Sequence, residues 1–195
     1  LVTALDVTKE DPKVRAMYGT GRLEPVDDGL PMLNDQFLAA RRLVEAGARY
    51  VTLGYGRWDY HGDNFGQLKR YLPMLDQALS SLVTDIHNRG LQNDVTVCVW
   101  GEFGRTPHST GDGRDHHATC FSTWMAGGGI KGGMTYGTTD EMGMSAVENP
   151  VDIHDIHATV LHPLGINHTK LTVRHNGIDR RLTDVHGHVV SEVLA

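Results

Sequence analysis

The sequence predicts an α/β fold in which a mostly parallel sheet carries helices on both faces. Predicted helices and strands alternate along the chain, and residues 94–100 form a nearly continuous apolar run, typical of a parallel strand buried on both faces. Two polar loops, 54–64 and 101–119, directly follow predicted strands. Because sites in such sheets lie beyond the carboxyl ends of the strands, we expect the chemistry at Trp58–Asn64 and Glu102–His117.

The elements of the first third follow from apolar spacing and from breaking residues. Residues 1–31 contain several prolines and little periodicity, which indicates an irregular or partly helical lead-in. Apolar residues at helical spacing predict a helix from Leu33 to Val44 that stops at Gly47. Arg49–Leu53 is predicted to be a strand that leads into the first polar loop.

The clearest predicted element is a helix over residues 68–86, where apolar side chains recur every three or four positions. Gly90 is expected to cap its end, and Pro73 to kink it near its first turns. Beyond the strand at 94–100, Phe121–Ala126 is predicted to be a second short apolar strand. Gly127–Gly133 is then predicted to be a bend.

The last third is predicted to hold one helix and one hairpin. Asp152 is placed to cap a helix that ends at Gly165. Two short runs around Asn176-Gly177 predict a hairpin, with strands at Leu171–Val173 and Arg180–Leu182. Val189–Leu194 is expected to close the chain as a short helix or strand.

Bulk properties exclude several classes of protein. The 195 residues are 39% hydrophobic and 22% charged, which is ordinary for a globular domain or a large piece of one. No apolar run approaches the roughly 20 residues of a membrane span. The formal charge is −6 and basic residues are scattered, so we expect no nucleic-acid partner.

The first polar loop offers a candidate metal site. Asp59 and His61 are two residues apart, so in an extended segment both side chains point to the same side. A carboxylate and an imidazole that converge suit Zn²⁺ or a similar divalent ion. The alternative is a plain Asp–His hydrogen bond, with Asp63 and Asn64 forming an Asx-type cap on the following helix.

The second polar loop offers acids, histidines and guanidinium groups. Glu102 follows an apolar strand, where an acid is costly to bury unless it is paired or bound to metal. Arg105 is either its salt-bridge partner or, with Arg114, a clamp for a phosphate or sulfate oxyanion. Asp115 and His116 form a second candidate ligand pair.

Weaker patterns lie elsewhere. The glycine-rich stretch Gly127–Gly133 lacks the Ser or Thr and the following helix of a phosphate loop, and the chain has no Gly-x-Ser-x-Gly elbow. His154 and His157 fall on neighbouring turns of the late helix, a spacing that exposed faces often show. Asp184 and His186 repeat the Asp-x-His spacing, but they follow no predicted buried strand.

Several of these segments, taken in order, resemble a known family. These segments are Trp58–His61, Gly101–Pro107, Gly113–His116, Ala126–Gly133 and Val151–Leu161 with Leu164-Gly165-Ile166. They are similar to an uncharacterised, sulfatase-like domain-of-unknown-function family of the alkaline-phosphatase superfamily. The resemblance runs from about residue 30 to the C-terminus. It implies that residues 1–195 form the C-terminal part of one alkaline-phosphatase-like domain.

The resemblance implies a metal-dependent hydrolase of phosphate or sulfate esters, acting on an anionic small molecule or a glycan ester. The expected metal is divalent, foremost Zn²⁺, with Mn²⁺, Ca²⁺ or Mg²⁺ as alternatives. Asp59 with His61, then Glu102, then His116 follow the family's order of late ligands. Asp115 is expected to be a ligand or an orienting neighbour, and Arg105 and Arg114 to neutralise the anion.

Departures from the superfamily pattern qualify these expectations. Glu102 replaces an Asp, and Phe103 stands where a His ligand is common, so a single-metal or degenerate site is an alternative. The nucleophile and the first metal-binding Asp are expected upstream, in an N-terminal part of the same bacterial, exported protein. A non-catalytic module that binds sulfated or phosphorylated polysaccharide is the alternative function.

Overall fold

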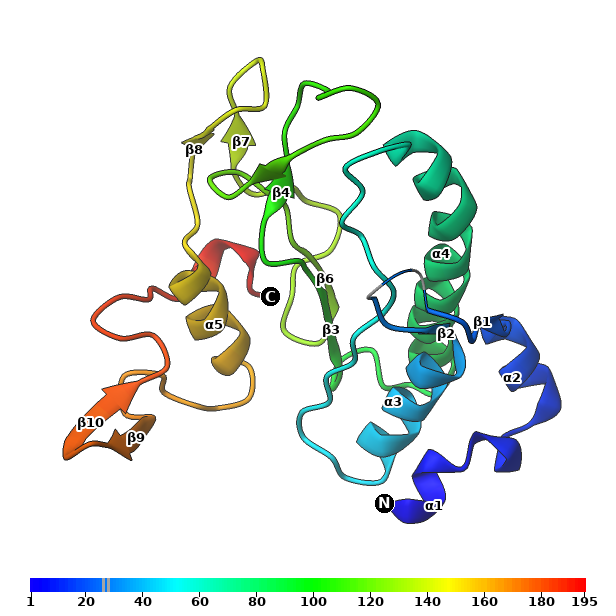
Figure 1. Ribbon diagram of the computed structural model, residues 1–195. Coiled ribbons are helices and arrows are strands. Elements are labelled where there is room, and N and C mark those ends of the chain that lie inside the picture. The colour runs from blue at the N-terminus through cyan, green and yellow to red at the C-terminus, as the bar shows by residue number, and fades with distance from the viewer. Residues whose placement is uncertain (26, 28) are drawn as a thin grey trace. The chain divides into compact units, whose positions relative to one another are not determined.

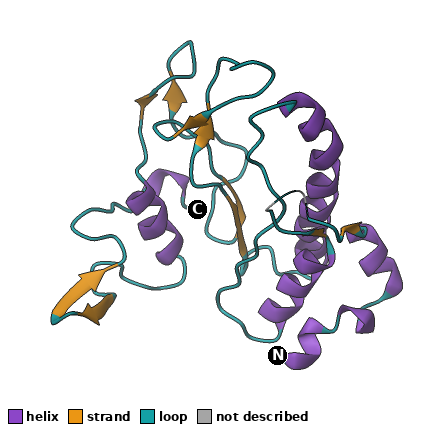
Figure 2. Ribbon diagram, in the orientation of Figure 1, coloured by secondary structure: helices purple, strands orange, loops and turns teal. Residues whose placement is uncertain are grey.

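The computed structural model describes residues 1–25, 27 and 29–195, and the chain divides into two compact units. Unit 1 comprises Leu1–Gln92 and His108–Asp115, and unit 2 comprises Asn93–Pro107 and His116–Ala195. Figure 2 shows long helices in unit 1 and mostly short strands joined by loops in unit 2.

The strands in the described part of the chain form five separate two-stranded sheets, all antiparallel, and no parallel sheet. The prediction of a mostly parallel sheet with helices on both faces is therefore wrong. Arg49–Leu53, counted as a parallel strand, joins no ladder among the described residues. The apolar run forms β3 (Thr96–Val99), but β3 pairs antiparallel with β6 (Trp124–Gly127), and its residues are only half-buried.

Unit 1 begins with three short helices, α1 (Val2–Leu5), η1 (Val7–Lys9) and α2 (Pro12–Tyr18), which confirms a partly helical lead-in. Asp11 starts α2: its carboxylate accepts the backbone N–H of Lys13 at 2.7 Å, and Pro12 supplies a helical φ at the first position. A two-residue ladder, β1 (Gly21–Arg22) with β2 (Met32–Leu33), then leads into α3 (Asp35–Glu45).

The long helix α4 (Asn64–Asn88) confirms the clearest expectation from sequence and extends it by one turn at its N-terminus. The helix continues past Pro73, and Gly90 follows its end with φ of +72°. Its buried positions recur at helical spacing along one face: Asn64, Tyr71, Ala78, Ser81, Leu82, Asp85 and Ile86. Figure 1 shows α4 and α3 side by side in unit 1.

A buried ionic network, here called the Arg41 network, ties the helices of unit 1 together. Arg41 is 3% exposed and donates to Asp85 at 2.8 Å and to Glu10 at 2.6 Å. The remaining members are Glu45, Arg42, Arg89 and Tyr18, each bonded to one of these carboxylates or to Arg41. Because every buried charge has a partner, the desolvation cost of the network is offset.

Unit 2 holds the other four ladders and one helix of nine residues. The remaining strands are β4 (Gly104–Arg105), β5 (His116–His117), β7 (Thr138–Thr139), β8 (Ala146–Glu148), β9 (Thr172–His175) and β10 (Ile178–Arg181). The helix α5 (Ile153–Leu161) and the closing 3₁₀ turn η2 (Ser191–Val193) complete it. The strand expected at Phe121–Ala126 is present but shifted toward the C-terminus.

Two local predictions in unit 2 are confirmed. Asp152 caps α5 in a reciprocal capping box with Asp155. Strands β9 and β10 form the expected hairpin, and Asn176 and Gly177 both adopt positive φ, at +50° and +80°. This pair of left-handed residues is what a two-residue hairpin turn requires.

The helices in the described residues include none that is both long and apolar enough to span a membrane.

Candidate metal site

The candidate site lies on the segment that leads into α4, and an aromatic cluster holds this segment in place. Tyr60 is 4% exposed and stacks on Tyr71 of α4, with ring centroids 6.3 Å apart. Met32 completes the cluster from β2. Upstream, the Tyr55 hydroxyl donates to the buried Asn34 side chain at 2.6 Å, so the segment is anchored on both sides of Trp58.

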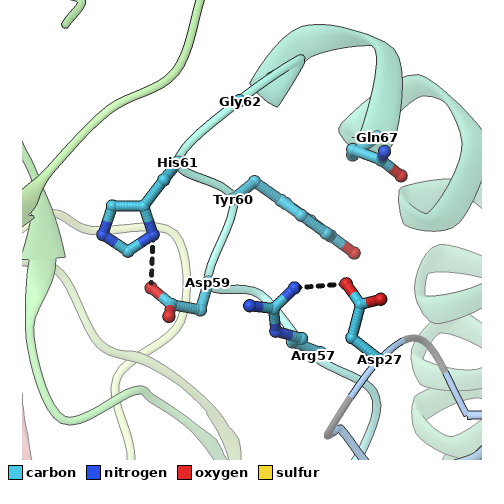
Figure 3. A pocket seen from close by; sticks show the side chains of 7 residues that line it. All are labelled: Asp27, Arg57, Asp59, Tyr60, His61, Gly62 and Gln67. Carbon is cyan, nitrogen blue, oxygen red and sulfur yellow. Dashed lines mark hydrogen bonds and ion pairs between the residues drawn. The ribbon is translucent and has the colours of Figure 1, made fainter.

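The anchored aromatic residue decides where its neighbours point. Side chains alternate in an extended segment, so with Tyr60 turned inward the two flanking residues turn the other way. Figure 3 shows Asp59 and His61 turned toward each other and Tyr60 directed to the opposite side, toward Gln67. The convergence expected from the two-residue spacing is therefore present.

The distance between the two groups suits a shared metal ion. His61 Nδ1 lies 3.3 Å from Asp59 Oδ1, and both side chains are about half-exposed, at 50% and 41%. An N–H···O hydrogen bond is commonly shorter, at about 2.9–3.0 Å. In a tetrahedral zinc site with Zn–N and Zn–O bonds of about 2.0–2.1 Å, two ligand atoms stand about 3.3–3.4 Å apart. The donor pair and its spacing therefore fit a divalent ion.

The loop 108–115 packs on the same segment within unit 1. The backbone N–H of Asn64 donates to the carbonyl oxygen of Asp112 at 3.1 Å. A Cβ on Gly113 would lie 1.7 Å from the carbonyl oxygen of His61, so only glycine allows this close approach. The contact places the part of the loop that carries Arg114 and Asp115 next to the Asp59–His61 pair.

Arg114 and Asp115 of this loop each contact another residue of unit 1. The guanidinium of Arg114 lies over the ring of Phe65, 5.6 Å from its centroid. Asp115 accepts the hydroxyl of Thr110 at 2.7 Å. Both residues are thus oriented by their own unit.

The Asx-type cap at Asp63 and Asn64, part of the alternative to a metal site, is not formed. Asp63 is the N-cap of α4 but has φ of +47° and no capping hydrogen bond from its side chain. Asn64 is buried as the first residue of the helix rather than acting as its cap.

The remaining predicted residues, Glu102, Arg105 and His116, belong to unit 2. Arg105 and His116 are paired on β4 and β5, and both contact Phe103: the His116 ring stacks at 4.1 Å and the Arg105 guanidinium lies 5.7 Å from the ring centroid. Glu102 is exposed, so the argument that a buried acid needs a metal does not apply to it. Its assignment as a ligand rests on the resemblance alone.

Next to Asp59 and His61 is a pocket of about 230 Å³. Its lining residues all belong to unit 1: Asp27, Arg57, Asp59, Tyr60, His61, Gly62 and Gln67. The sequence patterns did not indicate Tyr60 or Gln67 as site residues. For Tyr60 a signal existed, because an aromatic residue between two polar ones in an extended segment faces the opposite side. For Gln67 there was none.

The histidines of α5 have structural roles. His154 donates its backbone N–H to Asp152 at 2.9 Å, and this bond, together with its ring contact, lowers the pKa of Asp152. His157 contacts the carbonyl of Ile153 through Nδ1 at 2.8 Å. These contacts belong to the start of the helix and give no reason to place a metal there.

Among the family models, the curated proteins and the solved structures, a match comes from the family models. Neither the curated proteins nor the solved structures contain a match to this chain. A family model described as a protein of unknown function, DUF1501, matches residues 1–194. The chain therefore belongs to the DUF1501 family.

Proposed function

We propose that this chain contributes a metal site to a hydrolase of phosphate or sulfate esters, with Asp59 and His61 as its first ligands. The observation that carries the proposal is the 3.3 Å contact between His61 Nδ1 and Asp59 Oδ1 at the edge of a polar pocket. Zn²⁺ accepts this pair of donors, and Mn²⁺, Ca²⁺ or Mg²⁺ are the alternatives. Membership of the alkaline-phosphatase superfamily is part of the same proposal, supported by the resemblance of its ordered motifs.

Further ligands come from the second loop. Asp115 lies on the loop that packs against His61, and it serves as a ligand or orients one. His116 is the next residue, with its Cα about 3.8 Å from that of Asp115, and is proposed as another ligand. Glu102 is retained as a ligand on the family order of residues.

Arginine side chains supply the positive charge that an anionic ester requires. Arg114 and Arg105 are proposed to bind the phosphate or sulfate oxygens, because a guanidinium donates two parallel hydrogen bonds to such a group. The metal, when bound, would polarise an ester oxygen or lower the pKa of water. The nucleophile and the export signal are proposed to lie in the longer gene product.

The test is an assay of the full-length gene product with aryl phosphate and aryl sulfate esters, after removal of metal and again after addition of each divalent ion. We expect hydrolysis that requires metal and that Asp59→Asn abolishes. A protein that binds metal and retains sulfated polysaccharide without turnover would instead be the non-catalytic module. Metal-independent activity that survives Asp59→Asn would overturn the proposal.

A further inference from the structure

Two residues that line the pocket beside Asp59 and His61 each have a buried polar atom without a hydrogen-bond partner among the described residues. These atoms are the hydroxyl oxygen of Tyr60 and the side-chain carbonyl oxygen of Gln67. Figure 3 shows the Tyr60 hydroxyl directed into the space between Gln67 and Asp27. The large majority of buried side-chain polar atoms in proteins have a hydrogen-bond partner, either in the protein or in ordered water. Two such atoms on residues that line the same pocket therefore point to a ligand.

The chemistry of the two atoms specifies what that ligand must offer. The Tyr60 phenol donates a hydrogen bond, and the Gln67 carbonyl accepts one. One alcohol hydroxyl accepts from the first and donates to the second, and so satisfies both. A carboxylate, a sulfate or a fully ionised phosphate oxygen has no proton to give to Gln67, and an apolar group satisfies neither.

The charges of the pocket also disfavour an anion next to Tyr60. Arg57, the cation of the lining, is bonded to Asp27 at 2.6 Å. Asp59 adds a second carboxylate, and the described residues of the lining include no second Lys or Arg. Carboxylates outnumber guanidinium groups by two to one among these residues, so a neutral group fits the pocket better than an anionic one.

The volume limits the size of the ligand. An apolar cavity of about 150 Å³ holds a benzene ring. A pocket of about 230 Å³ therefore has room for a six-membered ring with several hydroxyl substituents.

We propose that this pocket binds a neutral, hydroxylated ring, a sugar or cyclic polyol, through one hydroxyl held between Tyr60 and Gln67. The ring's relation to the metal site rests on the proposed function, under which it is the alcohol portion of the ester. The binding of the ring itself does not require metal, because Tyr60 and Gln67 are held by the aromatic cluster and by α4.

The experiment uses the chain after its metal has been removed with a chelator. D-glucose and myo-inositol are each titrated into it, and ligand-observed NMR measures their binding. Tetrahydropyran, a six-membered ring without hydroxyl groups, and inorganic sulfate are the comparison probes. We expect at least one polyol to bind, tetrahydropyran to fail, and sulfate not to compete. Tyr60→Phe and Gln67→Leu should each weaken polyol binding roughly tenfold, since each removes one of two hydrogen bonds.

Tyr50→Phe is the matched control, because Tyr50 is 58% exposed and lies outside the pocket. It should bind the polyols as the unmodified chain does. Failure of both polyols to bind up to about 100 mM overturns the inference, as does binding that Tyr60→Phe leaves unchanged. An ordered water between Tyr60 and Gln67 that neither polyol displaces also overturns it. If polyols bind as expected but no ester is hydrolysed, the proposed function fails and the binding site stands.

Discussion

His61 Nδ1 lies 3.3 Å from Asp59 Oδ1, and the residue between them, Tyr60, is 4% exposed. The buried ring fixes the segment, so the two ligand atoms are already at the spacing of a zinc coordination edge. We predict that the metal-stripped chain binds Zn²⁺ and that Asp59→Asn lowers the affinity at least about tenfold. Isothermal titration calorimetry at one pH measures both values.

The chain offers a matched control for this prediction. Asp184 and His186 have the same spacing, but Asp184 adopts φ of +49°, which breaks the alternation that brings two side chains together. Asp184→Asn should leave Zn²⁺ affinity unchanged. Equal losses from the two variants would mean that zinc binds nonspecifically to acidic side chains.

Arg41 should be indispensable to the stability of unit 1. Its side chain is 2% exposed and forms ion pairs with Glu10, Glu45 and Asp85. Arg41→Met leaves these carboxylates without their buried cation, and removal of one partner from a buried pair costs about 3–5 kcal/mol. Urea unfolding followed by circular dichroism measures the loss. Lys9→Met, which removes a 61% exposed partner of Asp6, should cost less than about 1 kcal/mol.

The same network predicts acid sensitivity. Burial alone would raise the pKa of Glu10, but hydrogen bonds from Arg42 and Arg41 outweigh it and lower the pKa from 4.5 to about 2. Because the pKa is lower in the folded state, the stabilisation is complete above the unfolded pKa of 4.5 and is lost as the pH falls toward 2. Between about pH 6 and pH 3 the free energy of unfolding should fall by about 2 kcal/mol from Glu10 alone.

Urea unfolding at a series of pH values checks this prediction by difference. Glu10→Gln should be less stable at neutral pH, and its stability should fall less steeply in acid. Glu24→Gln is the control, since the Glu24 side chain is 75% exposed. If the Glu10 variant keeps the full acid dependence, the titration responsible lies in other carboxyl groups.

Sequence reasoning succeeded where a few adjacent residues decide the structure. The periodicity of α4, the Asp152 cap and the Asn176-Gly177 turn each depend on contacts within one or two turns of the chain. Strand pairing depends on residues far apart, and an apolar run such as 96–99 is compatible with either direction of its partner. The parallel sheet was therefore predicted wrongly even though the strand itself was found.

In the candidate site too, the features set by adjacent residues were predicted and those set by the fold were not. The convergence of Asp59 and His61 followed from two-residue alternation, which is local. The role of Gln67 depends on a buried side-chain oxygen that lacks a partner among the described residues. Whether a buried atom has a hydrogen-bond partner depends on the folded structure, so it could not be predicted from the sequence. Glu102 shows the converse, because its exposure removes the premise of burial from which it was predicted.

Removal of the hydroxyl from two buried tyrosines should change the free energy of unfolding differently. The Tyr60 hydroxyl has no partner among the described residues, whereas the Tyr18 hydroxyl donates to Asp85 at 2.9 Å. An unpaired buried polar group carries a desolvation penalty, and a hydrogen bond to a charged group contributes about 1.5–3 kcal/mol. We predict that Tyr60→Phe leaves the free energy of unfolding unchanged or raises it by up to about 1 kcal/mol, and that Tyr18→Phe lowers it by about 1.5–3 kcal/mol.

Urea unfolding of the two variants under identical conditions makes the comparison. Both substitutions remove one oxygen and leave the ring in place, so packing around Tyr60 and Tyr18 is preserved and the hydrogen bond is the difference between them. A protein that keeps an unbonded hydroxyl in a pocket gives up stability there, as expected where a group is reserved for a ligand. A loss of stability in Tyr60→Phe as large as that in Tyr18→Phe would show that the Tyr60 hydroxyl is bonded within the folded chain, and the reason for assigning it a ligand would disappear.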